Sequence, residues 1–273
     1  MPLAKLRDMI GGPAPVPAFN VIQVEHAEAI AAAAEETGAP VVLQISENAV
    51  RYHGTLRPIA AAALSVATAA AVPVAVHLDH ATSEELVREA VRLGFGSVMF
   101  DASALPHDEN VARTADVVRW CHWEGVGVEA ELGEIGGKDG VHAPGARTDP
   151  DDAAAYVAAT GVDLLAVAVG SSHAMLSRDA ELDFELITAL REAVPVPLVL
   201  HGSSGVADDN LAAAVRAGMR KINIATQLNK HFTASVRDVL GEDPALVDPR
   251  RYLGAGRAAV SAEVARLIRV LKG

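Results

Sequence analysis

Three histidines, at positions 80, 173 and 201, each follow a short run of aliphatic residues and precede small or polar residues. Such aliphatic runs are typical of buried strands in a parallel sheet. A histidine at the end of three separate strands suits a metal site, because neutral imidazole is a good ligand for zinc. Three protein ligands also leave one coordination position open for a substrate oxygen. The spacing therefore predicts a metal site with His80, His173 and His201 as ligands.

Asp79 lies directly before the first of these histidines. Neighbouring residues on a regular strand point to opposite faces, but a chain that turns at the strand end can bring both into one pocket. An aspartate beside a divalent cation stays ionised and can exchange a proton with a substrate hydroxyl. A role as helix N-cap is less favoured, because Thr82 and Ser83 already supply one. We therefore predict that Asp79 is catalytic.

Two further carboxylates, Glu129 and Glu131, alternate on one strand-like run. They could orient the histidines, hold a second cation, or form salt bridges inside the fold, and the sequence leaves these alternatives open. The glycine-rich stretch 133–147 follows them and is long for a connection between a strand and a helix. Long loops beside an active site are often lids, so we expect this loop to be one.

The elements that must position these residues are eight short aliphatic runs, which alternate with longer amphipathic segments. The predicted strands are Val16–Val21, Pro40–Ile45, Val72–Leu78, Ser97–Phe100, Gly127–Glu131, Val162–Val169, Val196–Leu200 and Lys221–Ala225. The predicted helices are Glu25–Thr37, Arg57–Ala71, Ser83–Leu93, Asn110–Glu124, Pro150–Thr160, Phe184–Ala193, Asp208–Ala217, Asn229–Leu240 and Gly256–Leu271. This order predicts a (β/α)8 TIM barrel with an additional C-terminal helix after a polar loop, Asp243–Tyr252. A doubly wound open sheet is the alternative.

The carboxyl ends of barrel strands share one face, and chemistry gathers there. The segments Gly202–Gly205 and Asn223–Thr226 follow the seventh and eighth predicted strands. Barrels frequently bind phosphate at this position, through backbone N–H groups and small hydroxyls. Gly202 and Gly205 let the backbone approach an anion closely. We therefore expect a phosphate group to bind here.

Length, charge and cysteine content limit the class of protein. The 273 residues suit one barrel domain, 1–273, and 51% are hydrophobic although only 4% are aromatic. A net charge of −12 argues against nucleic acid as the main partner, although local amides and cations can still hold a phosphorylated small molecule. One cysteine, no signal sequence at the start and no long apolar stretch favour the cytoplasm and no membrane partner.

The motifs together resemble the class II, metal-dependent ketose-bisphosphate aldolases along essentially the whole chain. The residues that carry the likeness are His77–His80, Glu129–Gly133 with Gly136 and Gly137, His173, Leu200–Gly205, Lys221–Thr226 and Asp248–Arg250. The resemblance implies a zinc-dependent lyase that cleaves fructose 1,6-bisphosphate to dihydroxyacetone phosphate and glyceraldehyde 3-phosphate, as in glycolysis and gluconeogenesis. It also implies that Asp79 transfers the hydroxyl proton.

The resemblance assigns roles to further residues. Asp101 and Glu131 match carboxylates near the metal that sometimes hold a second ion, and a monovalent cation, Na⁺ or K⁺, is common in the family. Arg250 resembles an arginine that reaches the far phosphate from a neighbouring subunit, which implies a homodimer or homotetramer. The implied substrate contacts are Asn20, Ser46, Ala174, Gly202, Ser203, Ser204, Asn223, Ile224, Ala225, Thr226 and Arg250.

Some residues depart from the family pattern. Ala174 and Ser203 replace a usual glycine and a common alanine, and the 133–147 loop lacks the glutamate that many relatives place after the glycine pair. Asp139 or Glu134 could take over its proton transfer. Ala225 occupies a position where some fructose-specific relatives carry an acid, so a tagatose-bisphosphate aldolase is an alternative. Two more distant hypotheses are a barrel that binds sugar phosphates without catalysis and a Schiff-base aldolase that uses Lys221.

Overall fold

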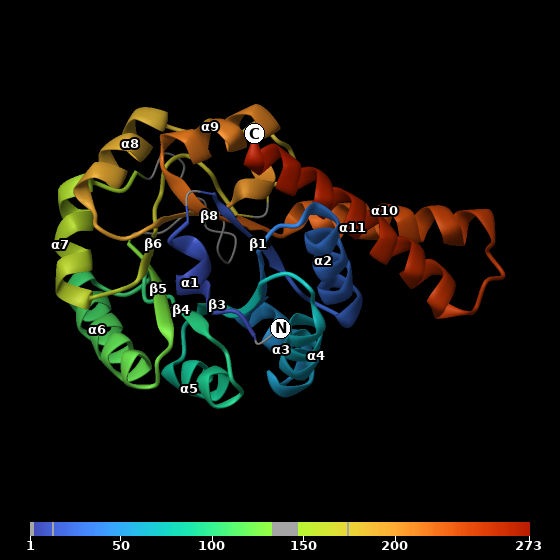
Figure 1. Ribbon diagram of the computed structural model, residues 1–273, viewed down its shortest axis with the longest axis horizontal. Coiled ribbons are helices and arrows are strands. Elements are labelled where there is room, and N and C mark those ends of the chain that lie inside the picture. Colours follow the sequence, from blue (N-terminus) through green and yellow to red (C-terminus); the bar gives the residue numbers. More distant parts are fainter. Residues whose placement is uncertain (1–2, 13, 133–146, 174) are drawn as a thin grey trace.

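The computed structural model describes residues 3–12, 14–132, 147–173 and 175–273. Its eight strands are all parallel and form a closed barrel in the order β1-β2-β3-β4-β5-β6-β7-β8 (Figure 1). The predicted (β/α)8 barrel is therefore confirmed, and the open-sheet alternative is wrong. The strands are β1 Val16–Asn20, β2 Val41–Ser46, β3 Val74–Ala81, β4 Ser97–Phe100, β5 Gly127–Glu131, β6 Leu164–Ala166, β7 Leu198–Leu200 and β8 Met219–Ile224.

Most helices surround the barrel on its outer side, whereas α1 lies across one end of it (Figure 1). The helices are α1 Leu6–Ile10, α2 Val24–Thr37, α3 Glu47–His53, α4 Arg57–Ala69, α5 Glu84–Arg92, α6 His107–Trp123, α7 Pro150–Thr160, α8 Phe184–Ala193, the 3-10 turn Ser203–Gly205, α9 Asp208–Ala217, α10 Thr226–Glu242 and α11 Pro249–Lys272. The short helices α1 and α3 were not predicted. No helix in the described part of the chain is long and apolar enough to cross a membrane.

Local sequence signals explain several element ends. Gly38 and Gly161 end α2 and α7 in the left-handed conformation, with φ of 59° and 71°. Ser83 begins α5, because its side chain accepts a hydrogen bond from the backbone of Leu86. The same signal corrects one prediction, since Asp248 caps α11 and Pro249 occupies its first turn. The C-terminal helix therefore starts inside the segment 243–252, which we expected to be a loop.

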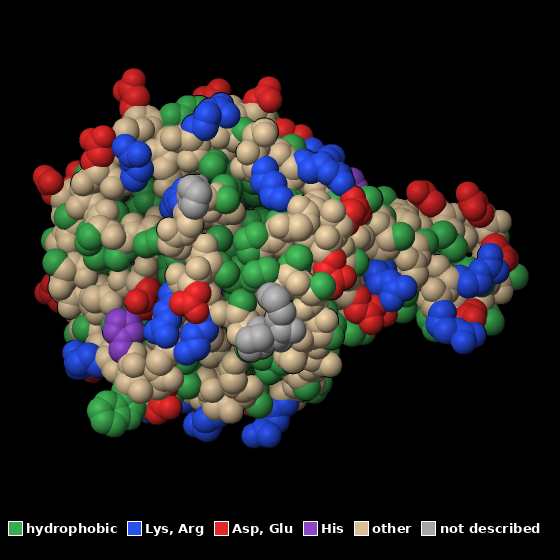
Figure 2. Space-filling view, in the orientation of Figure 1, with side chains coloured by type: hydrophobic (Ala, Val, Ile, Leu, Met, Phe, Trp, Pro, Cys, Tyr) green, Lys and Arg blue, Asp and Glu red, His purple; other side chains and the backbone are tan. Residues whose placement is uncertain are grey.

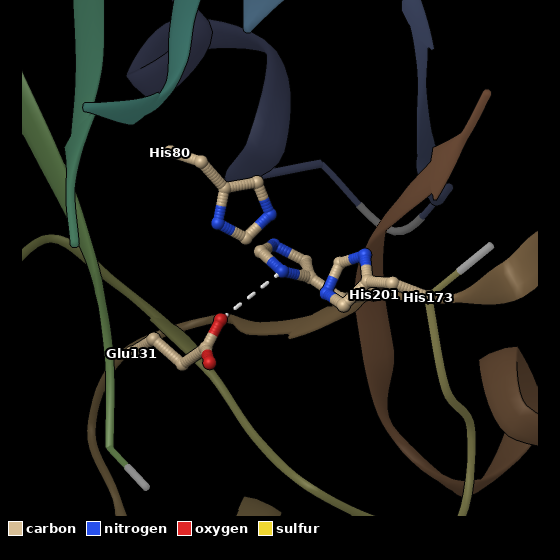
Figure 3. Close-up of side chains that lie close together, drawn as sticks. All are labelled: His80, Glu131, His173 and His201. Carbon is tan, nitrogen blue, oxygen red and sulfur yellow. Dashed lines mark ion pairs between the residues drawn. The ribbon is translucent and has the colours of Figure 1, made fainter. Parts of the chain in front are cut away.

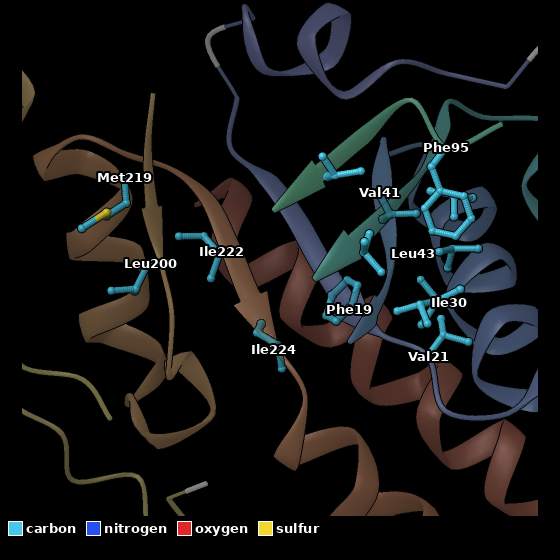
Figure 4. Close-up of a cluster of buried hydrophobic side chains, with 14 of the residues drawn as sticks. Phe19, Val21, Ile30, Val41, Leu43, Phe95, Leu200, Met219, Ile222 and Ile224 are labelled. Atoms are coloured by element: carbon cyan, nitrogen blue, oxygen red, sulfur yellow. The ribbon is translucent and has the colours of Figure 1, made fainter. Parts of the chain in front are cut away.

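Two apolar layers hold the barrel together. The larger one lies between the strands and the helices, and Figure 4 shows part of it, where Phe19, Val21 and Leu43 pack near Ile30 of α2. The smaller one lies inside the barrel, where Leu6 and Ile10 of α1 pack with small strand residues. Small alanines on the helices allow close approach to the sheet, which is how a chain poor in aromatic residues fills its core.

The last two helices form an arm. In Figure 1 α10 and α11 run side by side and project away from the barrel, and α11 also packs along α2. Figure 2 shows acidic and basic side chains along this projection. The arm tip carries Val247 with 88% of its surface exposed.

Candidate metal and substrate site

The three strand-end histidines meet at the mouth of the barrel. His80 lies on β3, His173 in the loop after β6, and His201 directly after β7. Their ring centroids are 4.7 Å apart for His80 and His201, 5.0 Å for His80 and His173, and 5.5 Å for His173 and His201. Figure 3 shows the three rings turned toward one another. Residues far apart in sequence thus form one cluster, as the spacing predicts.

Glu131 of β5 joins the three histidines. One potential ligand atom from each of these four residues lies within 4.8 Å of the others. The buried Nδ1 of His201 makes no hydrogen bond to any described residue, and it lies 3.4 Å from Oε2 of Glu131 (Figure 3). Three imidazoles and one carboxylate suit zinc, so these residues fit the metal that the sequence implies.

The charges around His201 also favour a cation. Burial by itself lowers the pKa of His201, but Glu129 and Glu131 together raise it to about 9. The two carboxylates therefore make this position attractive to positive charge. The same two negative charges would stabilise a divalent metal ion.

A bulge in β3 explains how Asp79 and His80 both reach the site. Leu78 pairs with Val98 and Ala81 with Phe100, so β3 uses one residue more than β4 over this stretch. His80 has a φ of 51°, which is rare for a residue with a side chain. Because of the extra residue, the side chains of Asp79 and His80 do not point to opposite faces as they would on a regular strand. The sequence predicted that both side chains could reach the pocket, but it attributed this to a turn at the strand end.

Asp101 supports His80 from behind. Its Oδ2 lies 2.8 Å from Nδ1 of His80, while its Oδ1 accepts hydrogen bonds from the backbone and hydroxyl of Ser103. Because Nδ1 is engaged in this way, His80 has Nε2 left for a metal. Asp101 is not part of the four-residue cluster, so the structure gives it a contact that orients His80.

Glu129 and Lys221 form a second supporting pair inside the barrel. Oε1 of Glu129 lies 2.9 Å from Nε2 of His201, and Oε2 accepts a hydrogen bond of 2.8 Å from Nζ of Lys221. All three side chains are fully buried. Burial raises the pKa of Glu129, but Lys221 and His201 lower it more, so it stays ionised. Glu129 thus both orients a histidine and forms a salt bridge. The sequence offered these as separate alternatives for this carboxylate.

Asp79 lies beside the cluster and is held as a carboxylate. Its Oδ2 accepts a hydrogen bond of 2.9 Å from the amide of Asn20, which in turn accepts one of 2.7 Å from Gln44. Burial raises the pKa of Asp79, but the charges of His80 and Lys221 outweigh that effect and lower it overall. An ionised carboxylate next to a cation can take a proton from a hydroxyl group.

The two small-residue segments lie side by side at the mouth. The hydroxyl of Ser204 accepts hydrogen bonds of 3.3 Å from the backbone of both Ala225 and Gln227, which ties the segment after β7 to that after β8. Gly202 has a φ of 67° and passes close to the backbone of Ser172. Two expected contacts turn away from the mouth: the Ser203 hydroxyl donates to the carbonyl of Leu200, and Ile224 is in the core.

The pocket over these residues has a volume of about 300 Å³, enough for a small sugar phosphate. Its lining is Asn20, Gln44, Ser46, Glu47, Asn48, Arg51, Asp79, His80, Thr82, His173, Gly202, Ser204, Asn223, Ala225 and Thr226. Sequence reasoning missed Gln44, Glu47, Asn48 and Arg51, and gave Thr82 only a capping role. Gln44 was detectable as a polar residue inside an aliphatic strand, two positions before Ser46 on the same face. The other three lie on the unpredicted helix α3.

The structure does not place some of the predicted site residues in the pocket. Arg250 is on the arm, where its side chain is 89% exposed and forms an ion pair with Asp248. Ala174, and the loop residues Glu134 and Asp139, lie outside the described residues, and so does the predicted lid 133–147 apart from Arg147 at its end. Lys221 lies within β8 and is bonded to Glu129, and it does not line the pocket.

Known proteins resemble this chain over almost its full length. Residues 6–273 match the family model described as fructose-bisphosphate aldolase class-II. A fructose-bisphosphate aldolase from Geobacillus stearothermophilus is 40% identical over 272 residues, covering 97% of this chain and 95% of the relative. The crystal structure of the YdjI aldolase from Escherichia coli K12 superposes with a TM-score of 0.86 at 33% identity, covering 98% of this chain and 97% of that one. A putative fructose-1,6-biphosphate aldolase from Coccidioides immitis gives a TM-score of 0.86 at 29% identity, over 97% and 94% of the two chains.

Proposed function

Because this chain belongs to the class II fructose-bisphosphate aldolase family, and is therefore a carbon–carbon lyase, we propose that it cleaves fructose 1,6-bisphosphate reversibly. The products are dihydroxyacetone phosphate and glyceraldehyde 3-phosphate, and the setting is glycolysis and gluconeogenesis in the cytoplasm. The observation that carries the proposal is the carboxylate of Asp79 in the pocket that His80 and His173 also line, beside the cluster that these two histidines form with Glu131 and His201.

We propose zinc as the cofactor, held by the three histidines. When bound, zinc acts as a Lewis acid that polarises the substrate carbonyl and so stabilises negative charge developing on its oxygen. Glu131 is close enough to serve as a further ligand, and Asp101 fixes the orientation of His80. A second ion near these two carboxylates, and a monovalent cation, Na⁺ or K⁺, belong to the same proposal.

Asp79 moves the hydroxyl proton in this proposal. In cleavage its carboxylate takes the proton from the hydroxyl group of the carbon that becomes the aldehyde, and in condensation it returns that proton. Asn20 holds the carboxylate in place, and Gln44 holds Asn20. The carbon-bound proton needs a second group, and Glu134 and Asp139 remain the candidates for it.

Dihydroxyacetone phosphate binds at the segments after β7 and β8. Gly202 and Ser204 of the first, and Asn223, Ala225 and Thr226 of the second, line the pocket and offer amide and hydroxyl donors. Ser203 and Ile224 would contribute backbone atoms, because their side chains point elsewhere. Asn20 and Ser46, at the ends of β1 and β2, provide further contacts at the mouth.

A tagatose bisphosphate is the second candidate substrate, because Ala225 lines the pocket where an acidic residue would favour the fructose compound. The two sugars differ in configuration at one carbon. We expect purified protein to cleave fructose 1,6-bisphosphate with the higher kcat/KM in a coupled assay of both sugars. Comparable or faster turnover of the tagatose compound would contradict the fructose assignment.

Metal removal tests the mechanism. Dialysis against a chelator should abolish cleavage, and added zinc should restore it. Borohydride in the presence of substrate should leave the enzyme active, because Lys221 is bonded to Glu129 inside the barrel. Inactivation by borohydride together with resistance to chelator would instead support a Schiff base.

A further inference from the structure

Arg51 is the basic residue of the pocket. Of the described residues that line the mouth, it is the only lysine or arginine. A sugar bisphosphate carries two phosphate groups, and a chain with a net charge of −12 must compensate each of them locally. The segments after β7 and β8 offer amides and hydroxyls for one phosphate. A cation elsewhere on the rim is suited to the other.

The guanidinium of Arg51 is held in place by two neighbours, but it keeps N–H donors that can bind a further group. Nη2 lies 3.0 Å from Oε1 of Glu47, and Nη1 donates to Oδ1 of Asn48 at 2.9 Å. Glu47 is itself fixed, because its Oε2 accepts a hydrogen bond of 2.7 Å from the backbone of Thr82. The Arg51 side chain is still 59% exposed, and a guanidinium has five N–H donors. An oxyanion can therefore bind a preorganised arginine.

The place of Arg51 on the rim matches the aldehyde half of the substrate. Helix α3 begins directly after β2, and Ser46 at the end of β2 pairs with Asp79 of β3. Asp79 serves the oxygen of the aldehyde carbon, so the rest of the aldehyde extends from that point. In the barrel β8 and β1 lie between β7 and β2, so α3 does not adjoin the segment that begins at Gly202, and the two line different parts of one pocket.

We propose that Arg51 binds the phosphate of the aldehyde half, and so selects phosphorylated aldehydes over unphosphorylated ones. The inference rests on the proposed aldolase function and adds to it a specificity-determining residue from within the same chain. The guanidinium fork pairs with two phosphate oxygens, while Glu47 and Asn48 keep it from turning away. Ser46, at the start of α3, lies on the same side of the pocket.

The test compares two aldehydes in the condensation direction. The zinc-loaded enzyme is given dihydroxyacetone phosphate with either glyceraldehyde 3-phosphate or glyceraldehyde, and the ratio of the two kcat/KM values is measured. We expect Arg51→Met to lower this ratio by about 10- to 100-fold, the usual effect of losing a charge-assisted pair. Arg51→Lys keeps the charge but not the fork, so it should retain part of the preference.

Arg57→Met is the matched control. Arg57 is an exposed arginine on the next helix, α4, it is paired with Glu89, and it does not line the pocket. The control should keep the wild-type ratio. An Arg51→Met enzyme with an unchanged ratio, including one that loses rate equally with both aldehydes, would overturn the role of Arg51 while leaving the aldolase function in place.

The proposed function fails in a different way. A wild-type enzyme that turns over neither bisphosphate removes that function, and with it this role of Arg51. Exchange of deuterium from solvent into dihydroxyacetone phosphate alone provides an independent readout, since it needs no aldehyde. Exchange at the wild-type rate in Arg51→Met, together with the lowered ratio, would localise the effect to the aldehyde half.

Discussion

Asp79 and His80 are neighbours in the chain, yet we propose separate roles for them in the pocket. The bulge in β3 turns both side chains inward, and each is held by a different partner, Asn20 for Asp79 and Asp101 for His80. Asp79 therefore can be changed without removing any residue of the four-residue cluster. That separation allows the proton transfer to be tested apart from metal binding.

Replacement of Asp79 by alanine should lower kcat by at least about 100-fold, the usual contribution of a general acid or base. Zinc content should remain that of the wild type, because the histidines keep their supporting contacts. Steady-state rates and elemental analysis of the same preparation measure both quantities. An active Asp79→Ala enzyme would show that another group moves the hydroxyl proton.

Lys221 affects the site through two buried side chains. It neutralises Glu129, which accepts the hydrogen bond of Nε2 of His201 and so leaves Nδ1 of that ring to face Glu131. Partners of this kind typically change metal affinity by about 10- to 100-fold. Removal of Lys221 would also leave the buried carboxylate of Glu129 without its lysine partner.

We therefore expect Lys221→Met to weaken zinc binding by about 10-fold or more. Competition with a chromophoric chelator measures the affinity directly, without reliance on turnover. Lys230→Met is the control, since Lys230 is an exposed residue of α10 bonded to the carbonyl of Leu176. Equal zinc affinity in the two variants would mean that Lys221 only fills the barrel interior.

Among the structural elements, the turn after β7 depends on a glycine. Gly202 has a φ of 67°, and a Cβ atom there would lie 2.5 Å from the carbonyl oxygen of Ser172. The atoms that this Cβ would meet belong to the backbone, which cannot turn aside as a side chain can, so the loop before His173 would have to move. The same turn carries the backbone that is proposed to bind phosphate.

Gly202→Ala should destabilise the protein by at least about 2 kcal/mol, because backbone strain and a steric clash add. Gly38→Ala is the matched control: its φ is 59°, but nothing lies within 4 Å of the added atom, so only the cost of about 1 kcal/mol for the left-handed conformation applies. Denaturant unfolding measures the difference. We also expect a higher KM for dihydroxyacetone phosphate in Gly202→Ala alone. Equal destabilisation of the two variants would contradict the close approach.

In the molecule as a whole, His26 lies where the arm joins the barrel. It belongs to α2 and stacks on Phe232 of α10 with ring centroids 5.2 Å apart, and neither ring nitrogen bonds to a described residue. Burial lowers the pKa of His26 from 6.5 to about 4. The unfolded chain therefore binds a proton at a higher pH than the folded protein does, and stability falls as the pH drops from about 6.5 toward 4.

His26→Leu should remove this acid sensitivity. Between pH 7.5 and pH 5, we expect the wild type to lose about 2 kcal/mol more unfolding free energy than the variant does. Denaturant midpoints at the two pH values measure the difference, and His107→Leu, at an exposed site on α6, should behave as the wild type. Parallel pH dependence of His26→Leu and the wild type would contradict a neutral buried ring.

Arg250 can contribute to catalysis only if a second copy brings it to a pocket, since it is exposed on the arm of its own chain. The expected homodimer or homotetramer can be tested by complementation. Asp79→Ala and Arg250→Ala enzymes should each be impaired, and mixed oligomers should regain activity, because one of their pockets combines an intact Asp79 with the partner's intact arm. Absence of recovery in oligomers shown to be mixed would argue against a contribution from a neighbouring copy.

Local sequence patterns were enough to predict the barrel and the meeting of three histidines at its mouth. Alternating aliphatic and amphipathic segments specify strands and helices locally, and residues at strand ends must share one face of a closed barrel. His80, His173, His201 and Asp79 could therefore be named from their positions alone. Caps such as Asp149 and Gly161 set the bounds of α7 as predicted, because they act within one turn of the chain.

Contacts between residues of different strands could be identified only from the folded structure. The bulge that presents Asp79 and His80 together arises from the register of β3 against β4, which a local pattern does not encode. The burial of Lys221 of β8 against Glu129 of β5 arises from a contact across the barrel interior, between strands that are not neighbours. Helix α3 was missed because its seven residues are too few to show a helical pattern of apolar positions. Arg51 belongs to that helix, so its place in the pocket was visible only once β2 and β3 were paired.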